Sequence, residues 1–414
     1  MRHGKSPLAV LFFTVFLDLL GFGLVIPLLP FFAQELGASG FEVGVVMTAY
    51  SAMQFLFSPF WGRLSDRIGR RPVLLVSITG NVLAMLLFAF STNLVVFFLA
   101  RAFAGMANAN IGTAQAYIAD VTPPEKRAQG MGLLGAAFGL GFVLGPAVGG
   151  ILATLGLAAP ALAAAALSAL NLGLAFFLLP ESLPAEARAA AAARRGSRLE
   201  TFRGALGHPV LPLLFLLFFL ATVGFAQLET TFALYTEKRF GYGTREAGLL
   251  FAWIGVVLAL VQGGLLRPLR KRLDEPSILL AGTVLLTCGL LLIAGARSLA
   301  QLVLACTVLA VGNGLQSPAL SGLVSRNAGA HEQGRVLGVN QSVGSLARIV
   351  GPLLGGVAYD LGGAAPVLAV GGVELAFLPW STPFLSAAVL LAGAAIIALR
   401  IFLRRERLEP APER

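Results

Sequence analysis

The sequence predicts an all-α polytopic membrane protein, with twelve transmembrane helices forming two six-helix bundles around a central cavity. Composition supports this fold, because 57% of the 414 residues are hydrophobic and 12% are charged, about half the charged fraction of a soluble domain. Apolar runs of about twenty residues, the length of a membrane-spanning helix, recur from end to end. Similar motifs also recur in the two halves of the chain, as in transporters built from repeats.

Twelve segments are long and apolar enough to be predicted spans. They are 8–33, 43–61, 72–91, 94–118, 128–152, 159–180, 209–235, 246–266, 277–296, 299–324, 334–358 and 382–403. The longest interruption, 181–208, is rich in Ala, Arg and Glu. We therefore expect an N-terminal six-helix bundle in 1–180, a cytoplasmic linker in 181–208 and a C-terminal six-helix bundle in 209–414.

The distribution of positive charge predicts the orientation of these spans. With both termini in the cytoplasm, the cytoplasmic side receives 24 of the 30 Lys and Arg residues, and the opposite side receives four. Short cytoplasmic loops carry such an excess of positive charge. The net charge of +10 therefore reports orientation and does not indicate a nucleic-acid partner. We expect a multi-pass protein of the cell (inner) membrane, and a monomer.

Two sequence repeats relate the halves of the chain. The fifth predicted span reads Gly-Pro-Ala-Val-Gly-Gly at 145–150, and the eleventh reads Gly-Pro-Leu-Leu-Gly-Gly at 351–356, 206 residues later. The first and seventh spans share Phe-Leu and Gly-Phe pairs at 16–22 and 219–225, 203 residues apart. The halves are thus predicted to be parallel repeats, the layout of transporters in which two bundles move around a central site.

Two motifs carry a resemblance to a known family. The charged stretch after the second span matches the loop motif A of the major facilitator superfamily at Gly62, Asp66, Arg67, Gly69, Arg70 and Arg71. The fifth span matches motif C, the antiporter signature, at Gly132, Gly141, Gly145, Pro146, Gly149 and Gly150. The chain therefore resembles the twelve-helix drug:proton antiporters of that superfamily, which include the tetracycline and multidrug efflux pumps.

This resemblance implies the major facilitator fold and a proton-coupled efflux antiporter that works by alternating access. The implied cargo is a small lipophilic drug, cationic drugs included, and the implied outcome is antibiotic resistance. The alternative is a major facilitator exporter of a sugar, metabolite or lipid, because the motifs do not identify the substrate. An enzyme is not expected, since no nucleophile, base and acid converge in the sequence. The sequence has no metal site or phosphate-binding loop, so no cofactor is expected, and the resemblance implies protons as the coupling ion.

Four ionisable side chains within spans are candidates for proton and substrate coupling, namely Asp18, Arg101, Glu229 and Arg348. An ionisable group inside a membrane is costly and is by default a functional candidate. Asp18 lies about 16 Å into its helix, near mid-membrane. A carboxylate whose access to water alternates there can load a proton on one side and release it on the other. Glu229 is predicted closer to the outer face, which suggests two acidic sites at different depths.

A structural alternative stays open for each of these side chains. Asp18 could serve only as an ion-pair partner of Arg101. Glu229 could be an interfacial, partly hydrated side chain, and Arg348 could have a purely structural pairing role. The fourth span also departs from the family pattern, because Ala104 replaces the usual glutamine before Gly105. We expect Asn108 and Asn110 to supply polar contacts instead.

The motif A stretch, 62–72, is predicted to be a short cytoplasmic loop between the second and third spans. The family resemblance implies a charge-relay cluster of Asp66, Arg70 and Asp120, in which Asp120 ends the fourth span on the same face. Such a latch would stabilise the outward-open state and would break for inward opening. In the second half, Pro268 stands where the aspartate would be, so only the first half can form an aspartate-centred latch.

Overall fold

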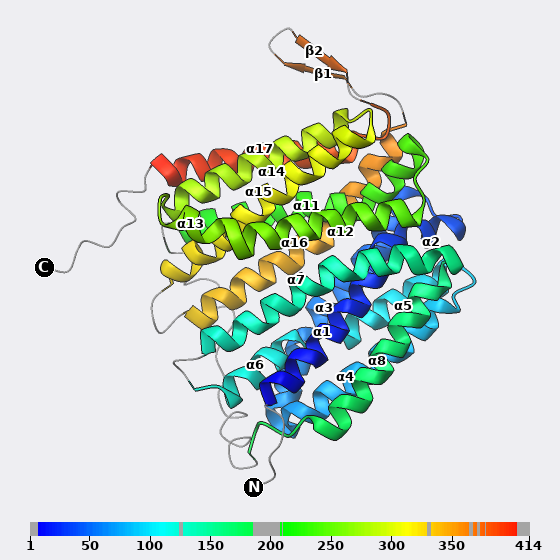
Figure 1. The fold of residues 1–414 in the computed structure, drawn as a ribbon, viewed down its shortest axis with the longest axis vertical. Helices are drawn as coiled ribbons and strands as arrows, with labels where there is room; N and C mark the ends of the chain where they lie inside the picture. The colour runs from blue at the N-terminus through cyan, green and yellow to red at the C-terminus, as the bar shows by residue number, and fades with distance from the viewer. Residues whose placement is uncertain are drawn as a thin grey trace, which may run out of the picture. The chain divides into compact units, whose positions relative to one another are not determined.

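The computed structural model describes residues 7–123, 127–184, 208, 210–328, 333–363, 367–370, 373–376 and 378–403. The chain divides into two compact units, one made of Met1–Gly196 with Gly241–Ala252 and the other of Ser197–Phe240 with Trp253–Arg414. Helices form nearly all of the described part (Figure 1). The predicted linker lies outside the described residues, apart from 181–184 and 208.

The helices before the linker follow the six predicted spans. They are α1 (Pro7–Val25), the 3-10 turn η1 (Ile26–Leu28), α2 (Leu29–Glu35), α3 (Gly40–Ile68), α4 (Arg70–Ala89), α5 (Leu94–Ala107), α6 (Ile111–Val121), α7 (Arg127–Leu152), the 3-10 turn η3 (Ala153–Leu155) and α8 (Ala158–Leu178). Pro27 and Pro30 account for the break between α1 and α2, because proline removes a backbone donor. The fourth span breaks between Ala107 and Ile111.

The elements after the linker follow the other six spans. They are α11 (Leu211–Phe240), α12 (Thr244–Leu260), the π-helical turn η4 (Val261–Leu265), α13 (Leu266–Arg270), α14 (Glu275–Gly295), α15 (Leu299–Arg326), α16 (Gln333–Leu361), the strands β1 (Val367–Val370) and β2 (Val373–Ala376), and α17 (Thr382–Leu403). Sequence periodicity does not predict the two strands, which pair antiparallel with Val370 opposite Val373.

The structure confirms the all-α membrane fold. Eleven of its helical segments are long and apolar enough to cross a membrane, counted over the described residues. The remaining predicted span, the eleventh along the chain, is α16, a continuous helix of 29 residues. It is less apolar than the others because Asn340, Gln341 and Arg348 lie within it. The twelve spans thus correspond to twelve helical segments, some of them interrupted.

Side-chain caps explain where several helices begin. Ser39 and Glu42 form a reciprocal capping box at the start of α3, in which Ser39 N–H donates to Glu42 Oε2 at 2.8 Å. Asn93 and Asp274 accept hydrogen bonds from the first-turn N–H groups of α5 and α14. These contacts satisfy backbone donors that have no partner inside the helix.

The prediction of a loop at 62–72 is wrong, because α3 continues to Ile68 and α4 begins at Arg70. Gly69 alone makes the turn, with φ of 109°, a conformation that favours glycine. The motif A residues Asp66 and Arg67 are therefore helical. Gly62 does not bring another element close, since a Cβ added there would meet nothing within 4 Å.

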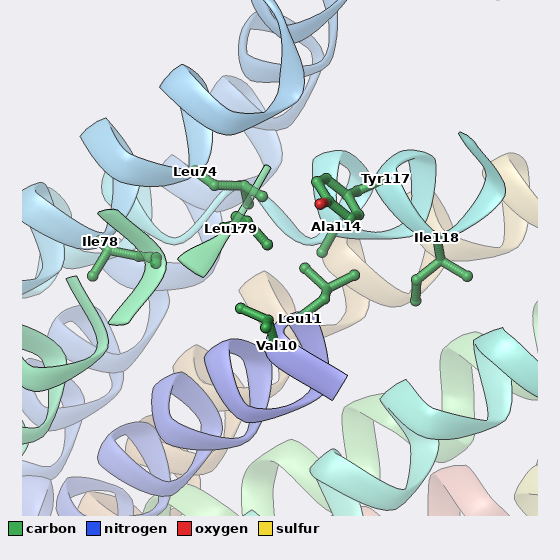
Figure 2. Close-up of a cluster of buried hydrophobic side chains, with 9 residues drawn as sticks. Val10, Leu11, Leu74, Ile78, Ala114, Tyr117, Ile118 and Leu179 are labelled. Atoms are coloured by element: carbon green, nitrogen blue, oxygen red, sulfur yellow. The ribbon is translucent and has the colours of Figure 1, made fainter. Parts of the chain in front are cut away.

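A hydrophobic cluster holds α1, α4, α6 and the end of α8 together in the first unit (Figure 2). Val10 and Leu11 of α1 contact this cluster, as does the fully buried Tyr117 of α6. The Tyr117 hydroxyl donates to the Pro180 carbonyl oxygen at 2.9 Å, which ties the chain just after α8 to α6. The residues 181–184 that follow are thereby held beside the start of α4.

Candidate functional site

Asp18 lies in the middle of α1 and is half-buried. Its Oδ1 accepts a hydrogen bond from Asn171 Nδ2 at 2.9 Å. Asn171, on α8, has no solvent-exposed surface and also donates to the Thr14 carbonyl oxygen at 3.0 Å. The Asn171 amide therefore fixes the orientation of the Asp18 carboxylate and ties α8 to α1. Asn171 is not among the sequence-predicted site residues, although a single amide in an otherwise apolar span is a usable signal.

Arg101 is buried in α5, and no carboxylate of the described residues pairs with it. Within the residues that the structure describes, no ion pair joins it to Asp18, whose carboxylate contacts the Asn171 amide. The Arg101 guanidinium lies over the Tyr50 ring of α3, 4.6 Å from its centroid. Its Nε and Nη1 have no hydrogen-bond partner in the described part of the chain. The aromatic face thus supplies the electrostatic contact to this cation.

Replacing Tyr50 with leucine should destabilise the protein, because the ring that faces the Arg101 cation is lost. Desolvated cation–π contacts contribute about 2 kcal/mol, so a clear fall in the thermal unfolding midpoint of the purified protein is expected. Tyr50→Phe keeps an aromatic face and should retain most of the midpoint. An equal loss in both variants would mean that Arg101 is not held by the ring.

Glu229 and Arg348 lie on two helices that pack together, α11 and α16. Both side chains are half-buried, and the Arg348 charge acts electrostatically on the Glu229 carboxylate. Arg348 Nη2 would lie 3.9 Å from a Cβ added at Gly344, beside the Phe218 ring. The structure therefore places an acid and a base near each other in the second unit, while Asp18 and Arg101 are separate in the first.

The break in the fourth span is filled by a buried network of amides and hydroxyls. Asn108 Nδ2 donates to Asn81 Oδ1 at 2.8 Å, and Asn81 Nδ2 donates to Ser168 Oγ at 2.9 Å. Asn110 Nδ2 donates to Ser77 Oγ at 2.5 Å. These bonds show how Asn108 and Asn110 supply polar contacts near the helix break. They also show that α4 and α8, which carry no charge within the membrane, present a polar face inward.

The charged motif forms a compact group, which we call the Arg70 cluster (Ser65, Asp66, Arg70, Asp120, Glu181 and Ser182). Arg70 Nη1 contacts Asp66 Oδ1 at 2.6 Å, and Arg70 Nε contacts Asp120 Oδ2 at 3.2 Å. Arg70 Nη1 also donates to Ser65 Oγ at 2.6 Å. Arg70 is therefore a nearly buried cation between two carboxylates, the geometry that a charge relay needs. Arg67 points to solvent at the end of α3.

Glu181 is a member of this cluster that sequence patterns do not reveal, because it falls at the start of the predicted linker. Its two carboxylate oxygens accept the backbone N–H groups of Arg70 at 2.8 Å and Arg71 at 3.2 Å. It thus caps the N-terminus of α4, where backbone donors and the helix dipole favour an anion. Ser182 Oγ donates to Asp120 Oδ2 at 2.9 Å and links this cap to the arginine pair.

The glycines of the fifth span bring α7 against α1 and η1. A Cβ added at Gly145 would lie 2.6 Å from Gly23, and one added at Gly149 would overlap the Leu24 carbonyl oxygen. Gly150 approaches Thr244 and Gly248 of the segment 241–252 in the same unit. Pro146 lies within the continuous helix α7. Gly132 differs from the rest, because nothing lies within 4 Å of its added Cβ.

The second unit carries a charge cluster of opposite polarity. Glu275 lies between Arg270, whose Nη2 is 3.9 Å from Oε1, and Arg326, whose Nε is 3.6 Å from Oε2. Arg270 and Arg326 occur 204 and 206 residues after Asp66 and Asp120, close to the repeat spacing. A central anion between two cations therefore corresponds to the central Arg70 between two anions. This part of the second unit therefore has charge pairing of its own, centred on a glutamate.

Comparisons with known proteins agree with this architecture. A model of the Major Facilitator Superfamily matches residues 11–352 and 276–414. "Tetracycline resistance protein, class C" of Escherichia coli is 36% identical, over 84% of this chain and 89% of that protein. "Multidrug resistance protein 2" of Bacillus subtilis is 30% identical, over 91% and 94%.

Solved structures show the same fold. The human organic anion transporter MFSD10 has a TM-score of 0.69 at 28% identity, over 96% of this chain and 100% of that one. The nucleoside transporter NupG has a TM-score of 0.72 at 15% identity, over 96% and 99%, and this likeness shows the fold alone.

Proposed function

Because the chain belongs to the Major Facilitator Superfamily, and is thus a multi-pass membrane transporter and not an enzyme, we propose that it is a proton-coupled efflux antiporter. Its cargo on this proposal is a small lipophilic drug, cationic drugs included, and its mechanism is alternating access. The tetracycline and multidrug resistance proteins among its relatives support this choice of cargo. The observation that carries the proton coupling is the carboxylate of Asp18 within the first span, held by the Asn171 amide and without an arginine ion pair among the described residues.

On this proposal, the proton and the cargo shift the same equilibrium between inward-open and outward-open states in opposite directions. Movement of the proton down its gradient can therefore drive movement of the cargo up its own gradient. One proton that moves down 100 mV supplies about 2.3 kcal/mol. This free energy corresponds to roughly a fifty-fold gradient of a neutral cargo. The excess of Lys and Arg in alternate loops favours cytoplasmic termini, and on this proposal export runs from the cytoplasm outward across the cell membrane.

Reconstituted vesicles test the proposal. Purified protein in proteoliposomes should move tetracycline or ethidium against its gradient when a pH gradient is imposed, and an ionophore that dissipates the gradient should stop the movement. Transport that does not depend on the pH gradient would contradict proton antiport. Transport of a sugar or metabolite without any drug movement would favour the alternative cargo class.

A second candidate cargo is an organic anion. The solved relative MFSD10 is named an organic anion transporter, and Arg101 is a buried cation whose Nε and Nη1 are unpartnered within the described residues. A lipophilic anion such as a fluorescent sulfonate should compete with tetracycline in the same vesicles if this cargo class is correct. A lack of competition, together with drug transport, would leave the lipophilic drug as the cargo.

The Arg70 cluster is proposed to act as the latch of the outward-open state. Neutralising either carboxylate removes one side of a nearly buried ion pair, and such losses are larger than those of exposed pairs. Asp66→Asn and Asp120→Asn should each shift the population toward the inward-open state, measured by distances between spin labels on the two bundles. Asp274→Asn is the control, because it removes a carboxylate outside the cluster and keeps a capping side chain. If the inward-open population were the same in all three variants, the motif would serve only to set the orientation of the chain in the membrane.

A further inference from the structure

A long groove follows α4 in the first unit, with α3 and α5 on one side and α8 on the other. It has a volume of about 930 Å³, at the upper end of the range for small-molecule sites. Thr79 lies on its floor, Phe60 and Phe103 on one wall, and Ala169, Gly173 and Phe176 on the other. Phe60 is 47% exposed and Phe176 is 55% exposed, so the groove is open along its length.

The groove offers no free donor to a polar ligand. Its lining carries two side-chain hydrogen-bond donors, and both are already used within the protein. The Thr79 hydroxyl donates to the Leu75 carbonyl oxygen at 2.9 Å, and Trp61 Nε1 donates to the Met106 carbonyl oxygen at 2.7 Å. The remaining lining is aromatic, aliphatic or glycine. The part of a ligand that fills this space must therefore be apolar.

Positive charge lies at one end of the groove. The Arg71 guanidinium is 5.5 Å from the centroid of the Phe176 ring, and its Nη2 donates to the Phe176 carbonyl oxygen at 2.6 Å. On the opposite wall, the exposed Arg63 donates from Nε to the Pro59 carbonyl oxygen at 3.2 Å, next to Phe60. Both arginines flank the turn at Gly69, at the membrane end that the charge distribution assigns to the cytoplasm.

We propose that this groove binds an anionic phospholipid, with one acyl chain along α4 and the headgroup at Arg71 and Arg63. Hydrocarbon lining beside two cations matches the two parts of such a lipid, and basic pockets between helices on the cytoplasmic side bind anionic headgroups. The groove is open and its lining belongs to segments long and apolar enough to cross a membrane, so an acyl chain of the bilayer can enter it. Arg71 follows Arg70 and shares the Glu181 cap, so the bound headgroup adjoins the Arg70 cluster.

Lipid binding to purified full-length protein tests this site without any transport measurement. Native mass spectrometry would count phosphatidylglycerol and phosphatidylcholine bound to the wild type and to variants. Ala169→Phe fills the groove from α8, whereas Ala166→Phe places the same ring on an exposed part of the same helix outside the lining. We expect about tenfold weaker phosphatidylglycerol binding in Ala169→Phe, the loss for two methylene groups kept out of the groove. Ala166→Phe should bind as the wild type does.

Two further variants keep the result interpretable. Gly173→Leu enters the groove from a position where an added Cβ meets nothing within 4 Å, so it should fold and weaken binding even if Ala169→Phe does not fold. Arg71→Gln should lower phosphatidylglycerol binding about fivefold and leave phosphatidylcholine unchanged. Equal binding of the two lipids to the wild type would overturn the proposal. So would loss of Nile red binding in Ala169→Phe with phosphatidylglycerol unaffected, because the groove would then hold a lipophilic cargo.

Discussion

Asp18→Asn should abolish proton-driven export, down to the level of passive leak. Asparagine is nearly isosteric with aspartate, and its side-chain oxygen can still accept the hydrogen bond that Asn171 donates at 2.9 Å. It cannot bind and release a proton. The fold and the cargo site should therefore survive, while the coupling is lost. Uphill transport in proteoliposomes under an imposed pH gradient measures this directly.

Exchange of cargo at equal pH separates coupling from damage. Asp18→Asn should still exchange labelled for unlabelled drug across the membrane, because exchange needs the moving bundles and not the proton. Asn171→Ala is the matched structural variant, since it removes the amide and leaves the carboxylate. If Asp18 had only a structural role, both variants would lose transport and exchange together. Glu229→Gln tests the second acidic site, and full proton-coupled activity in both acid variants would eliminate the two-site mechanism.

Gly149→Ala should prevent correct folding or strongly destabilise the protein. A Cβ at this position overlaps the Leu24 carbonyl oxygen, and a backbone atom cannot move aside as a flexible side chain can. Overpacking of a close contact costs about 1–3 kcal/mol and sometimes more. Unlike Gly132, Gly149 sits where α7 meets the broken part of the first span. Yield of monodisperse protein and its thermal unfolding midpoint are the measurements.

Gly132→Ala is the matched control in the same helix and the same motif. Its added Cβ meets nothing within 4 Å, and alanine favours a helix over glycine by up to about 1 kcal/mol. We expect an unchanged or slightly raised midpoint. Equal loss in Gly132→Ala and Gly149→Ala would mean that the motif is needed for a reason other than close packing.

Much of this protein could be predicted from local patterns. Hydropathy and helix length give the number of spans because the bilayer imposes the same length on every span. The repeated glycine motifs indicate that the chain consists of two related halves, and motifs A and C indicate the family. The charge density at 62–72 predicts a loop, whereas the structure has a one-residue turn at Gly69, because charged residues can continue a helix beyond the membrane. The hairpin β1–β2 has no comparable hydropathy signal in the sequence, since it is defined by hydrogen bonds between two short strands.

Local patterns along the chain specify the membrane fold, its repeats and the set of ionisable residues inside the spans. The side chains that those residues contact depend on how the helices pack. Asn171 reaches Asp18 across 153 positions, the Tyr50 ring faces Arg101, and Glu181 caps α4. The physical reason is that a span is specified by its own hydropathy, whereas a polar contact inside it depends on which helices are neighbours and how each is rotated.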